Sequence, residues 1–275
     1  MIYAVIVFLL TTAPAVGLFM MTRKLDKKEK ESKKLLLKIV LMELPFLIAT
    51  IIAENVSEIS LSLVTGSNME NPVFIFVMCF FVIGPAEELF KFLGAAIPTW
   101  KSPEFNCKFD GIVYCTTSAL TFALIENISY VAGSKIPLLT GIMRAICCFP
   151  GHFMYGVLMG VFYSRARIAA NNGNTSKKIL NFFLALLIPS LIHGLYDTLS
   201  FNLLPALNAV EGTSGGAEVI NIMKLLMLIG GMFIVVGGTY VALFTVIFRQ
   251  SKTDYFIAPA YPQPKKPADR MRSDT

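Results

Sequence analysis

Residues 72–94 read PVFIFVMCFFVIGPAEELFKFLG, an apolar run that passes without a break into a charged segment. Apolar runs of about 20 residues are long enough to cross a hydrocarbon core of about 30 Å as a helix. Glu87, Glu88 and Lys91 nevertheless lie inside this run. Charged side chains are costly within a bilayer and by default have a function there. The stretch therefore predicts a membrane protein with a polar site between its helices.

The composition of the whole chain supports this prediction. Of its 275 residues, 55% are hydrophobic and only 15% are charged, whereas charged residues make up about 25% of a soluble globular domain. Apolar stretches of membrane-spanning length recur along the sequence, so we expect an all-α, polytopic transmembrane helix bundle of about seven spans. The expected spans lie at about residues 2–21, 35–54, 72–97, 110–132, 138–163, 179–204 and 223–248.

The distribution of Lys and Arg predicts how the chain lies in the membrane. Basic residues are concentrated in the segments 22–34, 98–109 and 165–178 and in the tail, whereas 55–71 and 205–222 contain none. Because basic loops stay on the cytoplasmic side, the N-terminus is expected outside and the C-terminus in the cytoplasm. These loops account for the net charge of +6, which therefore does not indicate a nucleic-acid partner. We expect a multi-pass protein of the cell membrane, in contact with the lipid bilayer.

The chain is expected to form one membrane domain with four parts. Residues 1–71 contain two spans joined by a basic cytoplasmic loop, 72–204 contain a core of four spans, and 205–248 contain an outer loop and the last span. Residues 249–275 are rich in proline and charge, which predicts a disordered cytoplasmic tail.

Charged and polar residues recur inside the four core spans. They are Glu87, Glu88 and Lys91 in the third span, Glu126 and Asn127 in the fourth, Arg144 and His152 in the fifth, and His193 and Asp197 in the sixth. Both histidines of the protein belong to this set. Since each residue of this kind is a candidate for function, we expect a site where these four spans meet.

Helical geometry separates the roles of the two adjacent glutamates. Neighbouring positions on a helix differ by about 100°, so Glu87 and Glu88 cannot point in one direction. Lys91 follows them by four and three residues and can reach either carboxylate. We expect one glutamate to face a cavity while Lys91 or a neighbouring helix holds the other. The spacing slightly favours Glu87 as a base and Glu88 as the partner of Lys91. His193 and Asp197, also four residues apart, share a helix face.

This combination of side chains suits hydrolysis of a peptide bond. The reaction needs a base that activates water and a group that stabilises the oxyanion. Glu87 or Glu88 could be the base, with His152 and His193 polarising the scissile carbonyl. Alternatively, His152, His193 and Glu126 could hold Zn²⁺, which lowers the pKa of its bound water to about 7. Both designs use the same residues, and both stay open.

Other interpretations of these residues also stay open. Glu87, Glu88 and Lys91 could instead form a buried ion network that fixes helix packing. Glu126 and Asn127 could form a hydrogen-bonding pair between helices, and Arg144 is expected to pair with a buried acid. Carboxylates and imidazoles also relay protons, so a proton-coupled transporter is the alternative from another class of protein. A catalytically inactive scaffold is a further alternative.

Two more acids, Glu43 and Glu54, lie in the N-terminal part of the chain, within the expected span at 35–54. We expect both to be structural or to lie at the membrane interface.

Four motifs taken together resemble the PrsW family of intramembrane proteases. They are EELFK at 87–91, FALIENISY at 122–130, Arg144 followed by His152, and HGLYD at 193–197. Each motif alone is weak, but the four in this order are specific, and the resemblance covers about residues 72–204. The family belongs to a superfamily that also contains the type II CAAX prenyl endopeptidases and bacteriocin-processing proteins.

The resemblance implies roles for individual positions. The family's motif residues fall on Glu87, Glu88, Glu126, Asn127, His152 and His193, with the general base expected at the paired glutamates. In the prenyl endopeptidase branch, an asparagine that helps to bind the oxyanion stands where this chain has Asp197. An ionised aspartate cannot donate that hydrogen bond. Asp197 is therefore expected to orient His193 or to support a metal ligand.

The resemblance also implies a reaction. Proteins of this family are similar in activity to a protease that makes the first cut in a single-span anti-sigma factor and trims its outer part. The expected substrate is therefore a single-span, membrane-anchored regulator that is cut near the outer surface. A CAAX-type enzyme, which takes a prenylated peptide and opens toward the cytoplasm, is the alternative among hydrolases.

Overall fold

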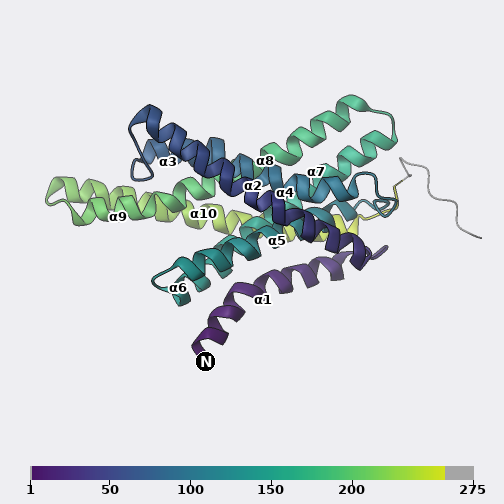
Figure 1. Cartoon of the computed structure of the whole chain (residues 1–275), viewed down its shortest axis with the longest axis horizontal. Helices are drawn as coiled ribbons and strands as arrows, with labels where there is room; N and C mark the ends of the chain where they lie inside the picture. The colour runs from purple at the N-terminus through teal and green to yellow at the C-terminus, as the bar shows by residue number, and fades with distance from the viewer. Residues whose placement is uncertain (1, 258–275) are drawn as a thin grey trace, which may run out of the picture.

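The computed structural model describes residues 2–257, and over that range the chain consists of helices joined by short loops (Figure 1). Seven helical segments are long and apolar enough to cross a membrane. They are Val5–Leu25, Lys33–Thr65, Pro72–Thr99, Asp110–Gly133, Pro137–Asn171, Thr175–Glu211 and Gly216–Lys252. The predicted all-α bundle of seven spans in a multi-pass membrane protein is confirmed, and its orientation in the membrane stays a prediction.

Ten α-helices and two short π-helical segments form the described part of the chain. The α-helices are α1 (Ile2–Leu25), α2 (Lys33–Thr65), α3 (Pro72–Met78), α4 (Gly84–Thr99), α5 (Asp110–Gly133), α6 (Pro137–Met143), α7 (Phe149–Asn171), α8 (Thr175–Phe201), α9 (Leu203–Glu211) and α10 (Gly216–Lys252). The π-helical segment η1 (Cys79–Ile83) joins α3 to α4, and η2 (Arg144–Cys148) joins α6 to α7.

Two of the predicted outer loops are largely helical. The segment 55–71 was expected to be a loop, but α2 continues to Thr65. Gly66 ends this helix in the left-handed conformation, with φ of 65°, and its N–H donates to Ser62 O. Most of the segment 205–222 likewise belongs to α9 and α10. Hydropathy predicts where a helix leaves the hydrocarbon core, but capping by a residue such as glycine decides where the helix ends.

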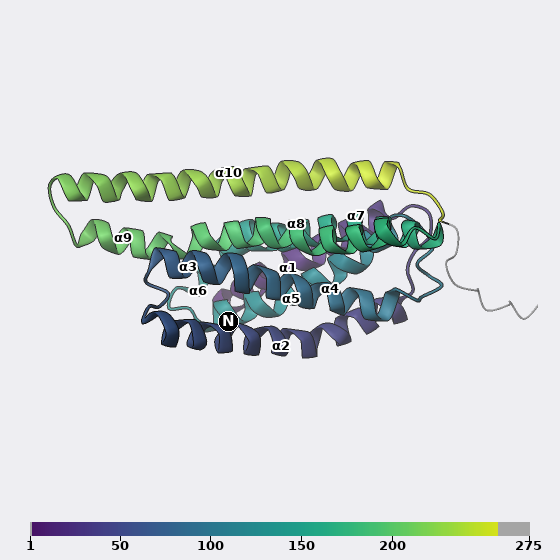
Figure 2. The same ribbon diagram turned by 90° about the horizontal axis from the view of Figure 1, so that it is seen from above.

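The centre of the bundle is formed by α5 and α7, and most of their side chains are buried. Gly160 of α7 allows the two helices to touch, because a Cβ there would lie only 2.5 Å from Ile112 Cα. Small residues at helix crossings are typical of packing within membranes. By contrast, α10 lies along one side of the bundle and α2 along the opposite side (Figure 2). Phe233 and Ile234 of α10 are each 76% exposed, as expected for side chains in contact with lipid.

The loops at the predicted cytoplasmic end are tied together by hydrogen bonds. Phe109 N–H, in the α4–α5 connection, donates to Asp254 Oδ1 (2.9 Å). Ile257 N–H donates to Asn106 O (2.7 Å) in the same connection. The segment that follows α10 is thereby fixed against the loop before α5.

This arrangement differs in part from the disordered tail that was predicted for residues 249–275. The residues up to Lys252 continue α10, and 253–257 have the hydrogen-bonding partners just described. Backbone groups that find partners on a neighbouring loop become ordered despite a polar sequence. The rest of the predicted tail, 258–275, lies outside the described residues.

Two buried acids, Asp26 and Glu31, lie in the α1–α2 loop at this same end, outside the spans. Glu31 is 3% exposed and accepts a hydrogen bond of 2.7 Å from the Tyr114 hydroxyl. Burial raises the pKa of Glu31 to about 7. Burial also raises the pKa of Asp26 to about 6, against the opposing charges of Lys30 and Arg23. Both acids therefore bind a proton more tightly in the folded protein than in the unfolded chain.

We expect the folded protein to lose stability as the pH rises. The ordinary pKa values are 4.5 for Glu31 and 3.8 for Asp26. The stabilisation from proton binding is fully present below these values and is lost as the pH rises through the folded values of about 6 and about 7. Thermal unfolding in detergent, measured across this pH range, would show the loss.

The Glu31→Gln variant should flatten the upper part of that profile, because glutamine cannot ionise. Glu211→Gln, an exposed substitution at the other end of the bundle, should leave the profile unchanged. A wild-type protein that becomes more stable as the pH rises through these values would contradict the expectation.

Candidate active site

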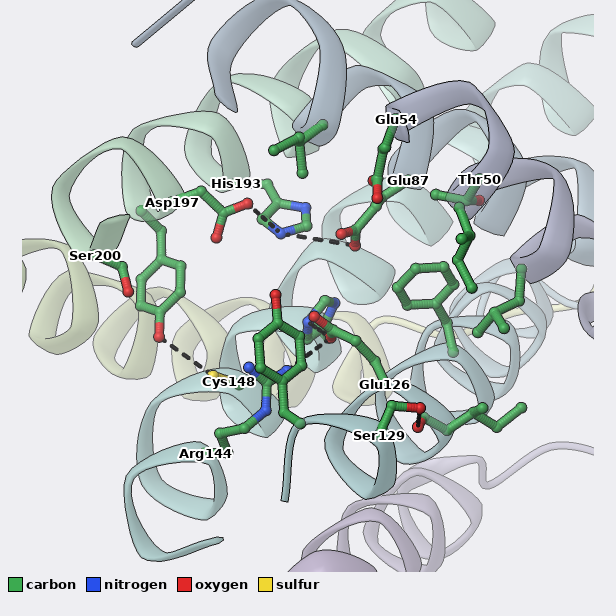
Figure 3. Close-up of a pocket in the computed structure, with 18 of the residues that line it drawn as sticks. Thr50, Glu54, Glu87, Glu126, Ser129, Arg144, Cys148, His193, Asp197 and Ser200 are labelled. Carbon is green, nitrogen blue, oxygen red and sulfur yellow. Dashed lines mark hydrogen bonds and ion pairs between the residues drawn. The ribbon is translucent and has the colours of Figure 1, made fainter. Parts of the chain in front are cut away.

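A cavity of about 370 Å³ opens between the spans (Figure 3). Its walls come from α2, α4, α5 and α8 and from η2 with the start of α7. The cavity extends from Glu87 to Ser129, which lies four residues before α5 ends at Gly133. Four residues of helix rise by about 6 Å. The cavity therefore reaches toward the predicted outer end of the bundle.

The two adjacent glutamates have different surroundings, as their spacing predicts. Glu87 lines the cavity, whereas Glu88 is fully buried and does not. Lys91 Nζ donates to Glu87 Oε2 at 2.8 Å and to Glu88 Oε1 at 2.9 Å. The lysine therefore pairs with both carboxylates at once, where the sequence analysis favoured Glu88 as its partner. One helix thus supplies the two acids and the cation that pairs with both of them.

His193 links this acidic pair to α8. Its Nδ1 lies 2.9 Å from Glu88 Oε1, and its Nε2 lies 3.2 Å from Asp197 Oδ2 and 3.8 Å from Glu87 Oε2. The ring of Tyr155 stacks on the imidazole with centroids 4.7 Å apart. The i, i+4 pair of His193 and Asp197 therefore does share a helix face, and that face meets α4.

His152 links the acidic pair to α5. Its Nδ1 lies 2.9 Å from Lys91 Nζ, and its Nε2 lies 3.0 Å from Glu126 Oε2. Because an ammonium group only donates hydrogen bonds, Nδ1 accepts from Lys91. In a neutral ring Nε2 then carries the hydrogen, and this nitrogen lies beside the Glu126 carboxylate. Both nitrogen atoms of His152 are therefore engaged by charged neighbours.

Arg144 completes this side of the cavity. Its Nη2 lies 2.9 Å from Glu126 Oε2, and its Nε donates to Asn127 Oδ1. Its guanidinium group stacks over the Tyr130 ring, 3.9 Å from the centroid. Arg144 thus pairs with a buried acid, as the sequence analysis expected.

Each π-helical segment precedes a site residue by the same interval. The segment η1 ends at Ile83, four residues before Glu87, and η2 ends at Cys148, four residues before His152. A proline stands two residues after each segment, at Pro85 and at Pro150. Proline lacks a backbone N–H and so cannot continue the regular α-helical ladder. The wider π turn changes the direction in which the following side chains point, and such turns are frequent at functional sites.

A close crossing of backbones brings α4 and α8 together beside the site. A Cβ on Gly84 would lie 2.9 Å from Gly194 N, and a Cβ on Gly194 would lie 2.9 Å from Cys79 O. Any larger residue at either position would push the helices apart. The crossing allows His193, next to Gly194, to reach Glu88 on the other helix.

Four of these side chains form a group that could hold a metal ion. Glu87, Glu88, His152 and His193 each offer one ligand atom, and the four atoms lie within 4.8 Å of one another. Carboxylate oxygens and imidazole nitrogens suit divalent transition metals. Glu88 Oε2 is buried without a hydrogen-bonding partner, which leaves an oxygen available for an ion. The residues present therefore fit a metal.

Glu126, which the sequence analysis placed with His152 and His193 as a possible metal ligand, lies outside the group of four. It is engaged by Arg144 and by Nε2 of His152. Its role as a metal ligand stays a prediction.

The structure thus brings all nine predicted site residues into one connected set of contacts, while their catalytic roles stay predictions. It also adds one residue that the sequence analysis treated as structural or interfacial. Glu54 of α2 lines the cavity. No motif marks this residue, because only tertiary packing brings α2 against the four core spans.

The amino-acid sequence is similar to those of known proteins. The family described as PrsW family intramembrane metalloprotease matches residues 31–237. Protease PrsW of Clostridioides difficile (strain 630) is 38% identical over 120 residues, which cover 43% of this chain and 49% of the relative. Protease PrsW of Oceanobacillus iheyensis is 35% identical over 123 residues, covering 45% of this chain and 54% of the relative. The chain spans about half the length of the curated relatives it matches, and no solved structure matches it.

We expect Lys91→Met to destabilise the fold strongly. The variant leaves the two carboxylates of α4 buried without a cation, and breaking a buried ion pair on one side costs about 3 to 5 kcal/mol. Thermal unfolding in detergent measures the effect, with Lys101→Met at an exposed position as the matched control. Replacing both glutamates by glutamine in the Lys91→Met variant should recover most of the loss. A Lys91→Met protein that unfolds like wild type would show that the ion network does not hold the helices together.

Proposed function

Because the chain belongs to the PrsW family of intramembrane metalloproteases, we propose that it is a membrane-embedded endopeptidase that hydrolyses a peptide bond of another membrane protein. One observation carries the proposal. Two carboxylates and two imidazoles gather within 4.8 Å of one another at a cavity between apolar spans. Hydrolysis requires a base, water and polar groups that stabilise the developing charge, and this group of side chains can provide the base and the polar groups.

Glu87 is the proposed general base. Its carboxylate lines the cavity, whereas that of Glu88 is buried behind it. Lys91 fixes Glu87 Oε2 at 2.8 Å, and Oε1 makes no hydrogen bond with any described residue. That oxygen is free to accept a proton from a water molecule in the cavity. Glu88 then serves to hold Lys91 and His193 in place.

His193 is the proposed carrier of the proton. After Glu87 takes a proton from water, the hydroxide adds to the carbonyl carbon, and the amine that leaves must gain a proton for the C–N bond to break. His193 Nε2 faces both Glu87 and Asp197, so it can give its proton to the leaving amine and then be reprotonated by Glu87. Asp197 orients this imidazole, which is a role that an ionised aspartate can fill.

Zinc is the metal that we propose for the family's metal site in this chain. Glu88, His152 and His193 would hold it while Glu87 stays the base, because carboxylate oxygen and imidazole nitrogen are usual ligands of zinc. When bound, the ion would lower the pKa of water and polarise the scissile carbonyl. Of the two contacts that His152 makes, with Lys91 and with Glu126, the ion would replace one and the other would keep the ring in its orientation.

The proposed substrate is a single-span, membrane-anchored regulator such as an anti-sigma factor, cut near the outer surface. The reach of the cavity to Ser129, near the predicted outer end of α5, supports this choice. A CAAX-type enzyme would open toward the cytoplasm. The half of α5 at that end, from Asp110 to Leu120, is buried throughout, which favours the outward-opening alternative.

We expect Glu87→Gln to slow cleavage by at least about a hundredfold, because general acid–base catalysis contributes about that much or more. Glu88→Gln, His152→Ala and His193→Ala should also lower the rate. A single-span anti-sigma reporter with a tag at each end, followed by immunoblot during co-expression, measures the rate.

Glu211→Gln, an exposed substitution on α9, is the matched control and should cleave like wild type. Cleavage at the wild-type rate by a variant that lacks both α4 glutamates would exclude the proposed mechanism. Proton-linked uptake that depends on the same residues, with no cleaved product, would instead indicate a transporter.

Metal content gives a separate test that does not depend on activity. Elemental analysis of the purified wild-type protein should find about one zinc per chain, as in single-ion catalytic sites. His152→Ala and His193→Ala should lose the zinc, whereas Glu126→Gln should retain it because Glu126 lies outside the group of four. Active wild-type protein without any bound metal would support the metal-free glutamate design.

A further inference from the structure

The wall of the cavity that comes from α2 has a regular pattern. Leu47, Thr50, Ile51, Glu54 and Asn55 line the cavity. Spacings of three, four, seven and eight residues place side chains on one face of a helix. One face of α2 is therefore turned toward the candidate active site over two turns of helix. We refer to these five residues as the α2 wall.

Glu54 differs from the other polar residues of the α2 wall. The hydroxyl of Thr50 donates to Phe46 O (2.9 Å), and Asn55 Nδ2 donates to Ile51 O (2.7 Å), so both bond to their own helix. Glu54 forms no ion pair or hydrogen bond with any residue in the range 2–257, and its Oε1 is buried without a partner. Its carboxylate is drawn beside that of Glu87 and points into the cavity (Figure 3).

The cations around the cavity are already engaged by other acids. Arg144 pairs with Glu126, and Lys91 pairs with the two glutamates of α4. The imidazole of His193 contacts Asp197, and that of His152 contacts Glu126. Among the described residues, none of these cations around the cavity is therefore left to pair with Glu54. A carboxylate within a membrane is costly without a partner of opposite charge.

We propose that Glu54 determines specificity by binding a positively charged side chain, Lys or Arg, of the substrate segment next to the scissile bond. This inference rests on the proposed function, because it assigns a binding role within the same cavity. The cavity is about 370 Å³, within the range of sites that enclose a small ligand, and so has room for a side chain beside the peptide bond. The ammonium or guanidinium group would supply the counter-charge that residues 2–257 do not provide.

A metal ion is the alternative partner for the carboxylate of Glu54, and the geometry disfavours a metal ion at this residue. The group of four ligand atoms within 4.8 Å of one another does not include this residue. A basic side chain needs only one carboxylate as partner, and its long apolar stem suits the Leu47 and Ile51 side chains of the same wall.

The test compares substrates that differ in one charge. Reporters with an identical single span would contain Lys, Ala or Glu at successive positions of the segment near the predicted outer end. Wild-type protein should cleave the best Lys reporter at least about tenfold faster, in kcat/KM, than the matching Glu reporter, a ratio within the range measured for close charge pairs.

Variants at position 54 test whether this residue sets the preference. Glu54→Gln should reduce the ratio to about two or less, and Glu54→Arg should reverse it, because like charges repel. Cleavage of the Ala reporter by Glu54→Gln serves as the reference. A larger loss for the Lys reporter than for the Ala reporter indicates a binding role, whereas equal losses indicate a catalytic one. Glu58→Gln, four residues further along α2 and outside the cavity lining, is the matched control. Thermal unfolding of Glu54→Gln should occur at the wild-type temperature or above it, because the variant removes an unpaired carboxylate, whereas a structural role predicts a lower unfolding temperature.

A cross-linking measurement keeps the test independent of cleavage. With a photo-crosslinking amino acid at position 51 and Glu87→Gln to prevent turnover, the Lys reporter should give more adduct than the Glu reporter. Adding Glu54→Gln should remove the difference. A charge preference in cross-linking without cleavage by the wild type would contradict the proposed protease and leave the binding role intact. Equal adduct yields and a cleavage ratio that Glu54→Gln does not change would overturn the inference.

Discussion

The ammonium group of Lys91 is the interaction on which the rest of the site depends. It lies 2.8 to 2.9 Å from Glu87, from Glu88 and from His152, and it is fully buried. Two adjacent carboxylates within a bilayer are tolerable only with a counter-charge. Since the lysine follows them on the same helix, the counter-charge is available before other helices pack. The ring of Phe122 covers the ammonium group at 4.2 Å, which excludes water from this side and strengthens the pairing.

Two further constraints determine where the neighbouring helices place their side chains. Each of α4 and α7 begins directly after a π-helical segment, with a proline two residues beyond it. The backbones of α4 and α8 then meet at Gly84 and Gly194, where no Cβ fits. The first constraint sets the direction of Glu87 and His152, and the second sets the distance to His193. Over residues 2–257 the site is thus formed by helix packing, without a contribution from the loops.

The charge distribution distinguishes the two ends of the bundle. At the predicted cytoplasmic end, loops and the segment after α10 bond to one another, and the acids there are buried and bind protons tightly. Toward the predicted outer end the bundle contains the cavity, and one of its acids, Glu54, has no partner among the residues that the structure describes. One end of the bundle is closed by hydrogen-bonded loops, and the cavity with the unpaired carboxylate of Glu54 lies toward the other end. This arrangement fits a substrate that enters from the outer side of the membrane.

The sequence by itself determined the class of fold and the members of the core site, because charged residues in apolar spans are conspicuous and helical spacing fixes which of them share a face. It predicted the difference between Glu87 and Glu88 for this reason. Tertiary structure alone decided that Lys91 pairs with both glutamates. It also decided that Glu126 contacts both His152 and Arg144, and that α2 ends at Thr65. It also decided that Glu54 faces the cavity. These outcomes depend on distances between residues on different helices, and no periodicity within one helix contains that information.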